Sequence, residues 1–299
     1  LDFLYAAALG GVYRDRTKTR AQVLRMGLEA VREAAGADIT LLGCGVPLGP
    51  AIGLFDGMRI GADVAPRWLP EWNNRDFFFP REPSMPSTRN AIHNTLTRGL
   101  LHKRWWINDP DCLLVRPDME LSLPEIHTLA TVIALSGGSM VVSDNLPDVP
   151  PDRLDIIYKL LPLIGEAPRV VDWFDSPQPR LMRLDLTKGD RTWHLAALIN
   201  RADHPLVDVP FAAADFQLPA GPYLYREFWS GESGLMKDGR TVFKKIPAHG
   251  VCLTALTPHT NPQEARYIGS SLHISQGLEV AEWTDEGQGL SLILERPGT

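Results

Sequence analysis

The chain has 299 residues, of which 30 are Lys or Arg and 36 are Asp or Glu, giving a net charge of −6. This acidic balance provides no electrostatic footprint for nucleic acid or for an anionic membrane surface, so a small neutral partner is favoured. The composition, 44% hydrophobic and 22% charged, is that of an ordinary globular protein, and the length fits two domains.

The cysteines Cys44, Cys112 and Cys252 are widely spaced and show no C-x-x-C pattern, which argues against a disulfide scaffold. Every apolar run is shorter than the length needed to cross a bilayer. The sequence starts at Leu1, not at Met, and inside an apolar, strand-like run, LDFLYAAAL. We therefore expect further chain before it, where any targeting segment would lie.

The first half of the chain alternates predicted strands and helices. Apolar residues at helical spacing predict a helix over Thr19–Ala35 that stops at Gly36. Two strand candidates follow, ITLLGCG and GLFDGMRIG. A helix over 87–102 then leads into RWWIND, and a helix from Pro124 to Leu135 leads into SMVVSDN. Alternation of this kind predicts a parallel sheet with crossover helices.

The pattern changes after a predicted helix over Arg153–Leu163. Short alternating segments such as RLMRLDL, TWHLAALIN, YLYREFWS and VCLTALTP follow, separated by Pro, Gly, Asp and Asn. Alternation with frequent turn residues is typical of an antiparallel sandwich. The sequence predicts a domain boundary near Ala167.

Polar residues follow several of the predicted parallel strands. In sheets of this kind the chemistry lies at the carboxyl ends of the strands, so we expect these residues to converge on one pocket. This convergence is the main residue-level argument for an enzyme. The candidates are Asp2, Cys44, Arg59 with Asp63, Asn108 with Asp109 and Asp111, and Ser143 with Asp144.

A carboxylate at one strand end and a second carboxylate two strands later form the constellation that hydrolyses glycosides, in which one attacks or stabilises the anomeric carbon and the other protonates the leaving oxygen. Asp2 and Asp63 fit these places, and the planar fork of Arg59 suits the orientation of an acid or of a sugar hydroxyl. Structural interpretations remain open. Asp63 also fits a helix N-cap with Arg59 as its ion-pair partner, and Asp2 fits a solvated chain end.

Other candidates also have structural interpretations. Cys44, between two glycines, fits a small buried hydrophobic residue with no base beside it. Asp109 and Asp111 fit turn residues around Pro110. The histidines are scattered, so the aspartates lack the His cluster that a transition-metal site would use.

The segments LDFLYAAAL, LLGCGVPLGPAIGLFDGMRIGADVAP, RNAIHNTLTR, RWWINDPDCLL and MVVSDNL resemble, in this order, the catalytic barrel of glycoside hydrolase family 36, the melibiase-like alpha-galactosidases. The resemblance implies an α/β fold, with residues 1–166 forming the C-terminal part of a (β/α)8 TIM barrel, from the end of strand 4 to helix 8. It implies an antiparallel β-sandwich domain over residues 167–299, where the match rests on position and pattern.

The resemblance also implies site residues. Asp2 matches the family's nucleophile, although the lysine of the family's Lys-x-Asp motif would precede Leu1. Asp63 matches the acid/base, Arg59 the arginine of its Arg-x-x-x-Asp motif, and Cys44 with Gly45 the Cys-Gly turn that lines the sugar subsite. The implied mechanism retains the anomeric configuration through a covalent galactosyl-enzyme and uses no metal or organic cofactor.

The implied function is hydrolysis of terminal alpha-D-galactosyl residues from an alpha-galactoside substrate. An alpha-N-acetylgalactosaminidase and an inactive carbohydrate-binding pseudoenzyme are the alternatives. Because the family also uses aspartates and tryptophans from earlier strands and from an N-terminal sandwich, we expect this chain alone to have little or no activity. A cytoplasmic location and a homo-oligomer of the full-length protein are further expectations from the resemblance.

Overall fold

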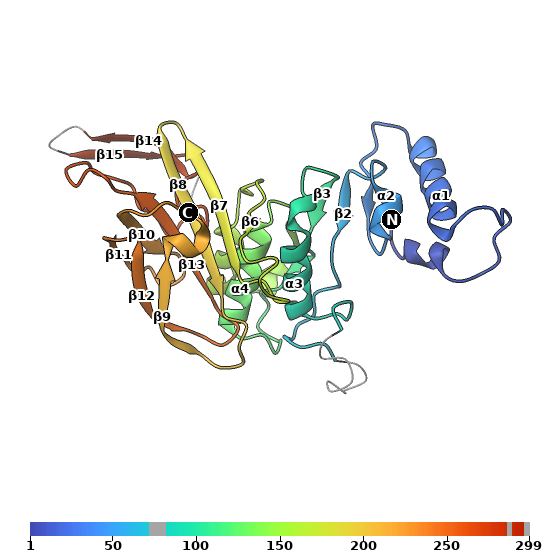
Figure 1. The fold of residues 1–299 in the computed structure, drawn as a ribbon, viewed down its shortest axis with the longest axis horizontal. Helices are drawn as coiled ribbons and strands as arrows, with labels where there is room; N and C mark the ends of the chain where they lie inside the picture. The colour runs from blue at the N-terminus through green and yellow to red at the C-terminus, as the bar shows by residue number, and fades with distance from the viewer. Residues whose placement is uncertain (72–81, 286–288, 296–299) are drawn as a thin grey trace.

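The computed structural model describes residues 1–71, 82–285 and 289–295 (Figure 1). Figure 1 shows the N-terminal elements at one end of an elongated molecule, helices α3 and α4 in the middle, and antiparallel strands at the other end. Within the described residues, no helix combines the length and apolar character needed to span a membrane.

The parallel region contains short strands. A three-stranded sheet has the order β1-β2-β3, and β4 pairs in parallel with β5 in a separate two-stranded sheet. Because β1, β2 and β3 run parallel, the residues that follow each of them lie at the same edge of this sheet. The strands are β1 (Leu42–Gly43), β2 (Gly57–Arg59), β3 (Ile107–Asp109), β4 (Cys112–Leu113) and β5 (Val141–Val142).

Leu1 extends this sheet by one ladder step. Its amino group donates to the Leu42 carbonyl at 2.9 Å, and the Cys44 amide donates to the Leu1 carbonyl at 2.8 Å, which is the bonding pattern of a parallel pair. The strand-like interpretation of LDFLYAAAL is wrong beyond this point, because Leu4–Ala8 forms the 3-10 helix η1. Phe3, just before η1, adopts a left-handed φ of 56°, which turns the chain out of the strand direction.

The helices between these strands begin at sequence-encoded caps. Thr19 and Gln22 form a capping box at the start of α1, and Gly36 ends that helix as predicted. Ser122 and Glu125 form a second capping box before α4. The predicted helix over 87–102 divides into α3 and the 3-10 helix η2. The helices are α1 (Arg20–Ala35), α2 (Leu48–Ala51), α3 (Thr88–Arg98), η2 (Gly99–Leu101), α4 (Leu123–Leu135), η3 (Leu146–Asp148) and α5 (Pro151–Tyr158).

The described parallel strands do not close into a barrel. They form an open three-stranded sheet and a two-stranded sheet, so the barrel expectation holds only as an alternation of parallel strands and helices. The pairing changes from parallel to antiparallel between β5 and β6. The predicted division into residues 1–166 and 167–299 stays a prediction.

The antiparallel region is built around a six-stranded sheet in the order β11-β10-β13-β8-β7-β6, with β9 and β12 forming a second sheet and β14 and β15 a third. The strands are β6 (Arg169–Val170), β7 (Leu181–Lys188), β8 (Arg191–Ile199), β9 (Leu206–Ala212), β10 (Tyr223–Glu227), β11 (Ser233–Met236), β12 (Arg240–Ile246), β13 (Val251–Pro258), β14 (Val280–Asp285) and β15 (Leu290–Leu294); the 3-10 helix η4 (Ala213–Phe216) follows β9.

Alternate residues of the central strands bury their side chains in two different cores. In β8, Leu195 and Ala197 belong to the core shared with α4, whereas Ala196 and Leu198 belong to the core beneath β9 and β12. Because neighbouring side chains in a strand point to opposite faces, this period-two pattern covers the sheet on both sides. The antiparallel region expected from the alternation is therefore observed, with the six-stranded sheet and the β9–β12 pair sharing one core.

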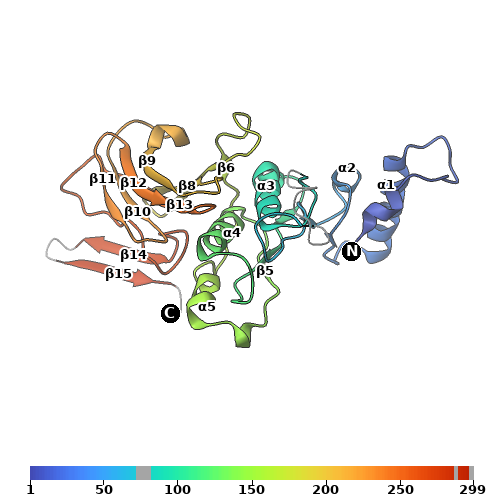
Figure 2. The same cartoon turned by 90° about the horizontal axis from the view of Figure 1, so that it is seen from below.

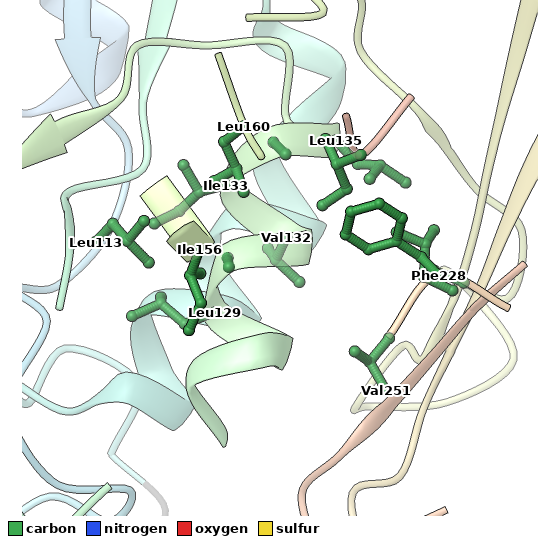
Figure 3. Close-up of a cluster of buried hydrophobic side chains, with 14 of the residues drawn as sticks. Leu113, Leu129, Val132, Ile133, Leu135, Ile156, Leu160, Phe228 and Val251 are labelled. Atoms are coloured by element: carbon green, nitrogen blue, oxygen red, sulfur yellow. The ribbon is translucent and has the colours of Figure 1, made fainter. Parts of the chain in front are cut away.

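Helix α4 lies between the parallel and antiparallel regions, as the two perpendicular views show (Figures 1 and 2). Ten of its 13 residues are buried. Figure 3 shows Leu129, Val132 and Ile133 of this helix in one cluster with Leu113 from β4 and Val251 from β13. A mostly apolar helix of this kind is buried on nearly all sides, and each fully buried Leu, Ile or Val side chain contributes about 1.5–3 kcal/mol.

Candidate functional site

Arg59, at the end of β2, is surrounded by three carboxylates. Its Nε lies 3.1 Å from Asp109 Oδ2, and its Nη1 lies 2.9 Å from Asp111 Oδ2 and 3.2 Å from Asp63 Oδ1. The side chains of Asp109 and Asp111 are 1% and 6% exposed, whereas that of Asp63 is 67% exposed. Two buried carboxylates thus hold the arginine from the protein side, and it presents a third, solvated carboxylate at the surface.

The charges in this cluster support one another. Burial alone would lower the pKa of Arg59, but the carboxylates of Asp109 and Asp111 raise it above its ordinary value. Asp109 is the last residue of β3, and Asp111 lies in the tight turn after it, where it has a φ of 79° and its amide donates to Asp109 Oδ1 at 2.9 Å. Asp111 also accepts from the Val64 amide at 2.7 Å, which fixes the backbone beside Asp63.

The sequence interpretation of Asp109 and Asp111 as turn residues was therefore incomplete. They do form a turn around Pro110, and they also bind Arg59, which lies 50 residues earlier than Asp109. The signal that pointed to them was two aspartates flanking a proline directly after an apolar strand. What the sequence lacked was the pairing of β2 with β3, which sets Arg59 opposite Asp109 in the ladder.

Asp63 does not cap a helix. The N-cap of α3 is Ser87, whose side chain accepts from the Asn90 amide at 3.2 Å, so the N-cap interpretation of Asp63 is wrong. The Asp63 main-chain carbonyl instead accepts from the Ser87 amide at 3.0 Å. Its side chain is left to Arg59 and solvent, in agreement with the ion-pair interpretation.

Cys44 lies at the centre of the candidate residues. Burial, followed by a hydrogen bond with Asp2 and the charges of Asp2 and Asp63, raises the pKa of the Cys44 thiol to about 11, while the charge of Arg59 opposes this shift. The side chains of Asp2, Arg59 and Asp63 therefore all act on the sulfur atom of Cys44. The thiol stays protonated at neutral pH, so Cys44 is no thiolate nucleophile here.

Gly45 supports the approach of the N-terminal segment to this point. It has a left-handed φ of 58°, and a Cβ on it would lie 3.3 Å from the Phe3 amide nitrogen. Its carbonyl accepts from the Tyr5 amide at 2.7 Å. The Asp2 side chain, in turn, accepts from the Phe3 amide at 2.7 Å, so the carboxylate is oriented by its own backbone.

Gly45 and Arg59 border an open hollow of about 380 Å³, together with Tyr5, Val46 and Arg98. Among these, Arg98 of α3 donates to the Ile60 carbonyl, which ties the helix to the end of β2. Its lining combines the charged side chains of Arg59 and Arg98 with apolar residues such as Val46. This arrangement suits a small polyhydroxylated ligand, because polar groups set its orientation and apolar groups its packing.

Asn108 and Asp144 do not join this group. The Asn108 side chain donates to the carbonyls of Arg98 and Gly99, both at 3.3 Å. The buried Asp144 carboxylate accepts from the Val115 amide at 2.6 Å and pairs with Arg116 at 2.8 Å. The prediction that these two residues converge with the others is wrong, because their side chains are used in fixing the surrounding loops.

Ser143 lies one step outward from the cluster. It interacts with the Cys112 thiol, whose pKa is raised to about 11 by burial and by Asp111. The same Asp111 holds Arg59, so Ser143 is linked to the site only through two intervening side chains.

In the part of the chain that the structure describes, no group of three or more His, Cys, Asp or Glu residues is placed to hold a metal ion. The guanidinium group of Arg59 pairs with both Asp109 and Asp111, and its one positive charge offsets part of their negative charge. The chemistry available among the described residues of this cluster is therefore that of carboxylates, a guanidinium group and a neutral thiol.

No protein-family model matches the sequence. Among solved structures, alpha-galactosidase I from Mortierella vinacea matches with a TM-score of 0.61 and 15% identity, over 79% of this chain and 63% of its own. A GH27 β-L-arabinopyranosidase from Geobacillus stearothermophilus matches with a TM-score of 0.59 and 17% identity, over 81% and 55%. An isomalto-dextranase from Arthrobacter globiformis T6 matches with a TM-score of 0.55 and 18% identity, over 86% and 45%.

The chain is thus structurally similar to alpha-galactosidases and to related glycosidases. It spans less than two thirds of the length of each of these three enzymes. Their different names show that this fold serves more than one sugar, so the substrate has to be argued from the site.

Proposed function

We propose that a protein carrying this chain is a retaining exo-glycosidase of family 36 that removes terminal alpha-D-galactosyl residues. The observation that carries the proposal is Arg59, which is anchored by buried Asp109 and Asp111 and presents Asp63 beside Cys44 and Asp2. Similarity to an alpha-galactosidase fold supports it, as do the quoted sequence motifs.

In the proposed reaction, an Asp2 carboxylate oxygen attacks the anomeric carbon, and the bond from that carbon to the leaving oxygen breaks. Asp63 gives its proton to the leaving oxygen, so the alcohol departs neutral and a galactosyl ester on Asp2 remains. Asp63 then takes a proton from water, the water oxygen attacks the same carbon, and Asp2 is released. Two displacements retain the anomeric configuration.

Arg59 has a positioning role in this scheme. Its Nη1 lies 3.2 Å from Asp63 Oδ1, so it orients the carboxylate that exchanges a proton in both steps. The acid role in the first step needs an environment that keeps the proton, and desolvation by a covering wall and a bound substrate supplies one. Asp63 is 67% exposed in this chain. We therefore propose that turnover requires the barrel strands outside these 299 residues, and that the chain alone has little or no activity.

The leaving group tests the acid role of Asp63. In a protein that joins this chain to the remaining barrel strands, Asp63→Asn should slow alkyl alpha-galactosides about 100- to 10,000-fold and p-nitrophenyl alpha-galactoside much less, because only the poor leaving group needs the proton. Asp208→Asn is the matched control, since Asp208 is 69% exposed and paired with Lys244 at 3.0 Å, far along the chain in β9. Equal losses on both substrates would rule out Asp63 as the acid.

The substrate assignment has its own test. The same protein should cleave p-nitrophenyl alpha-galactoside faster than its 2-acetamido counterpart. A preference for the acetamido sugar would point to an alpha-N-acetylgalactosaminidase, and binding of galactose without turnover would point to a pseudoenzyme.

A further inference from the structure

A cavity of about 550 Å³ lies away from the candidate site, between the start of α3 and two loops of the antiparallel region. Basic side chains line it from both sides: Arg89 and His93 belong to α3, and Arg201 follows β8. Ser176 and Gln178, from the loop before β7, complete its polar lining. None of these residues takes part in the proposed glycosidase chemistry.

Arg201 reaches this cavity without an ion pair. Its Nε and Nη2 both donate to the Pro179 carbonyl, at 3.2 and 2.9 Å, and no described carboxylate lies within ion-pair distance. Burial lowers the pKa of Arg201 to about 10, with Asp172 opposing the shift and Arg89 adding to it. A guanidinium charge is therefore held here at a cost that a bound anion would offset.

The imidazole ring of His93, on α3, also lines this cavity. Its Nδ1 is buried and has no hydrogen-bond partner among the residues that the structure describes. Burial, together with the charges of Arg201, Arg98 and Arg89, lowers the pKa of His93 below its ordinary value. A buried ring nitrogen without a partner is uncommon, because it loses its bond to water and gains nothing in return.

The carboxylates that face these cations are already engaged. Asp203, whose charge acts on Arg89, accepts from His249 Nε2 at 2.8 Å. Asp172, whose charge acts on Arg201, accepts from the amides of Arg180 and Leu181 at 3.0 Å. Neither carboxylate is within ion-pair distance of Arg201, so no carboxylate of the described residues pairs directly with the Arg201 guanidinium group.

We propose that this cavity binds a small oxyanion, the phosphate or carboxylate group of an organic ligand, through Arg201 and His93. The planar fork of Arg201 matches such a group, and a protonated His93 adds a second charged donor. The first turn of α3 contains no acidic residue, so its positive end adds to the attraction. The inference is independent of the proposed glycosidase function.

The unmodified chain provides the first test. The pKa of the His93 imidazole, followed by nuclear magnetic resonance, should rise in sodium sulfate relative to sodium chloride at equal ionic strength, because sulfate stays fully charged across the titration. His194, which pairs with Asp185 on β7 at 2.6 Å, is the internal control and should not respond differently to the two salts. An identical His93 pKa in both salts would overturn the proposal.

A variant provides the second test. Calorimetric titration with inorganic phosphate and, separately, with acetate should show a weakening of about 10- to 100-fold for Arg201→Gln, which corresponds to one hydrogen bond between charged groups. Arg240→Gln, at the exposed start of β12, is the matched control. Tighter phosphate than acetate binding assigns the site to phosphate ligands, and the reverse to carboxylates. Unchanged affinity in Arg201→Gln would refute the site, and if this variant fails to fold the histidine titration decides alone.

Discussion

The parallel sheet around β1, β2 and β3 and the antiparallel sheet around β8 and β13 bury their strands to very different extents. The parallel strands have two or three residues each, and Leu42 and Ile107, which flank Gly57 in the ladder, are both 43% exposed. β8 and β13 have nine and eight residues and are covered on both faces.

Parallel sheets in proteins are normally covered on both faces, and the exposed Leu42 and Ile107 depart from that norm. The central strands of the antiparallel region are covered on one face by the core shared with α4 and on the other by β9 and β12. The candidate catalytic residues lie in the parallel region, where the polar cluster around Arg59 adds to the apolar core that α1 shares with Met58 of β2.

The largest expected effect tests that polar cluster. Arg59→Ala leaves the carboxylates of Asp109 and Asp111 buried without a counter-charge, and should lower the free energy of unfolding by about 3–5 kcal/mol. Arg183→Ala is the matched control from the antiparallel region: Arg183 is equally 15% exposed, but its partner Asp185 is 53% exposed. Its ion pair should count for about 1 kcal/mol or less in urea unfolding. Equal losses would mean that the cluster stabilises no more than a surface pair.

The second prediction compares one substitution in both regions. Leu253→Ala, at a fully buried position of β13, should cost about 2–5 kcal/mol, because it removes buried methyl groups and leaves a cavity. Leu42→Ala, at a 43% exposed position of β1, should cost about 0.5 kcal/mol or less. A large loss at Leu42 would show that something already covers the parallel face in solution. Thermal or denaturant unfolding of both variants measures the difference.

The third prediction concerns the junction between the regions. His249 stacks on Trp68 with ring centroids 4.3 Å apart and lies 2.7 Å from Glu125 of α4. Burial opposes its charge, but Glu125 and Asp203 raise the pKa of His249 above its ordinary value. The stabilisation is therefore fully present below about pH 6.5 and is lost as the pH rises through the raised pKa. The loss should disappear in His249→Gln, which carries no titrating ring.

His127 gives the matched contrast on the same helix. It stacks on Trp229 with ring centroids 3.8 Å apart, and burial lowers its pKa to about 4. A lowered pKa reverses the sign: this stabilisation is present above about pH 6.5 and is lost as the pH falls toward 4. Unfolding free energies measured from pH 4 to 9 should therefore change slope in His127→Gln at the acidic end only. A change at the same end in both variants would contradict the assignments.

The smallest expected effect separates helices held by caps from helices held by packing. Thr19→Ala removes the side chain that accepts from the Gln22 amide and should cost about 1 kcal/mol. Because α1 buries only Leu24 and Leu28, the loss should appear as faster hydrogen exchange at its first turn. Ser122→Ala, the corresponding change before α4, should leave the exchange of α4 slow, since ten of its residues are buried.

Local signals predicted much of this structure. The capping residues and Gly36 located α1, and period-two alternation located the sandwich strands. Arg59 with Asp63 was recognised as a possible ion pair from a spacing of four residues. The partnership of Arg59 with Asp109 and Asp111 was not, because it depends on the register of β2 with β3, which no local pattern encodes. Leu4–Ala8 was misread as a strand, since a short apolar run does not distinguish a strand from a helical turn.

The burial of α4 on all sides also bears on how the molecule melts. One face of this helix packs with Leu113 of the parallel region and another with Val251 of the antiparallel region, so neither region can lose its structure without exposing the helix to water. The heat absorbed by the two regions should accordingly appear as a single cooperative peak, with calorimetric and van't Hoff enthalpies in agreement. A cut in the connection after α5 should leave the two pieces associated, because the helix itself and not the linker joins them.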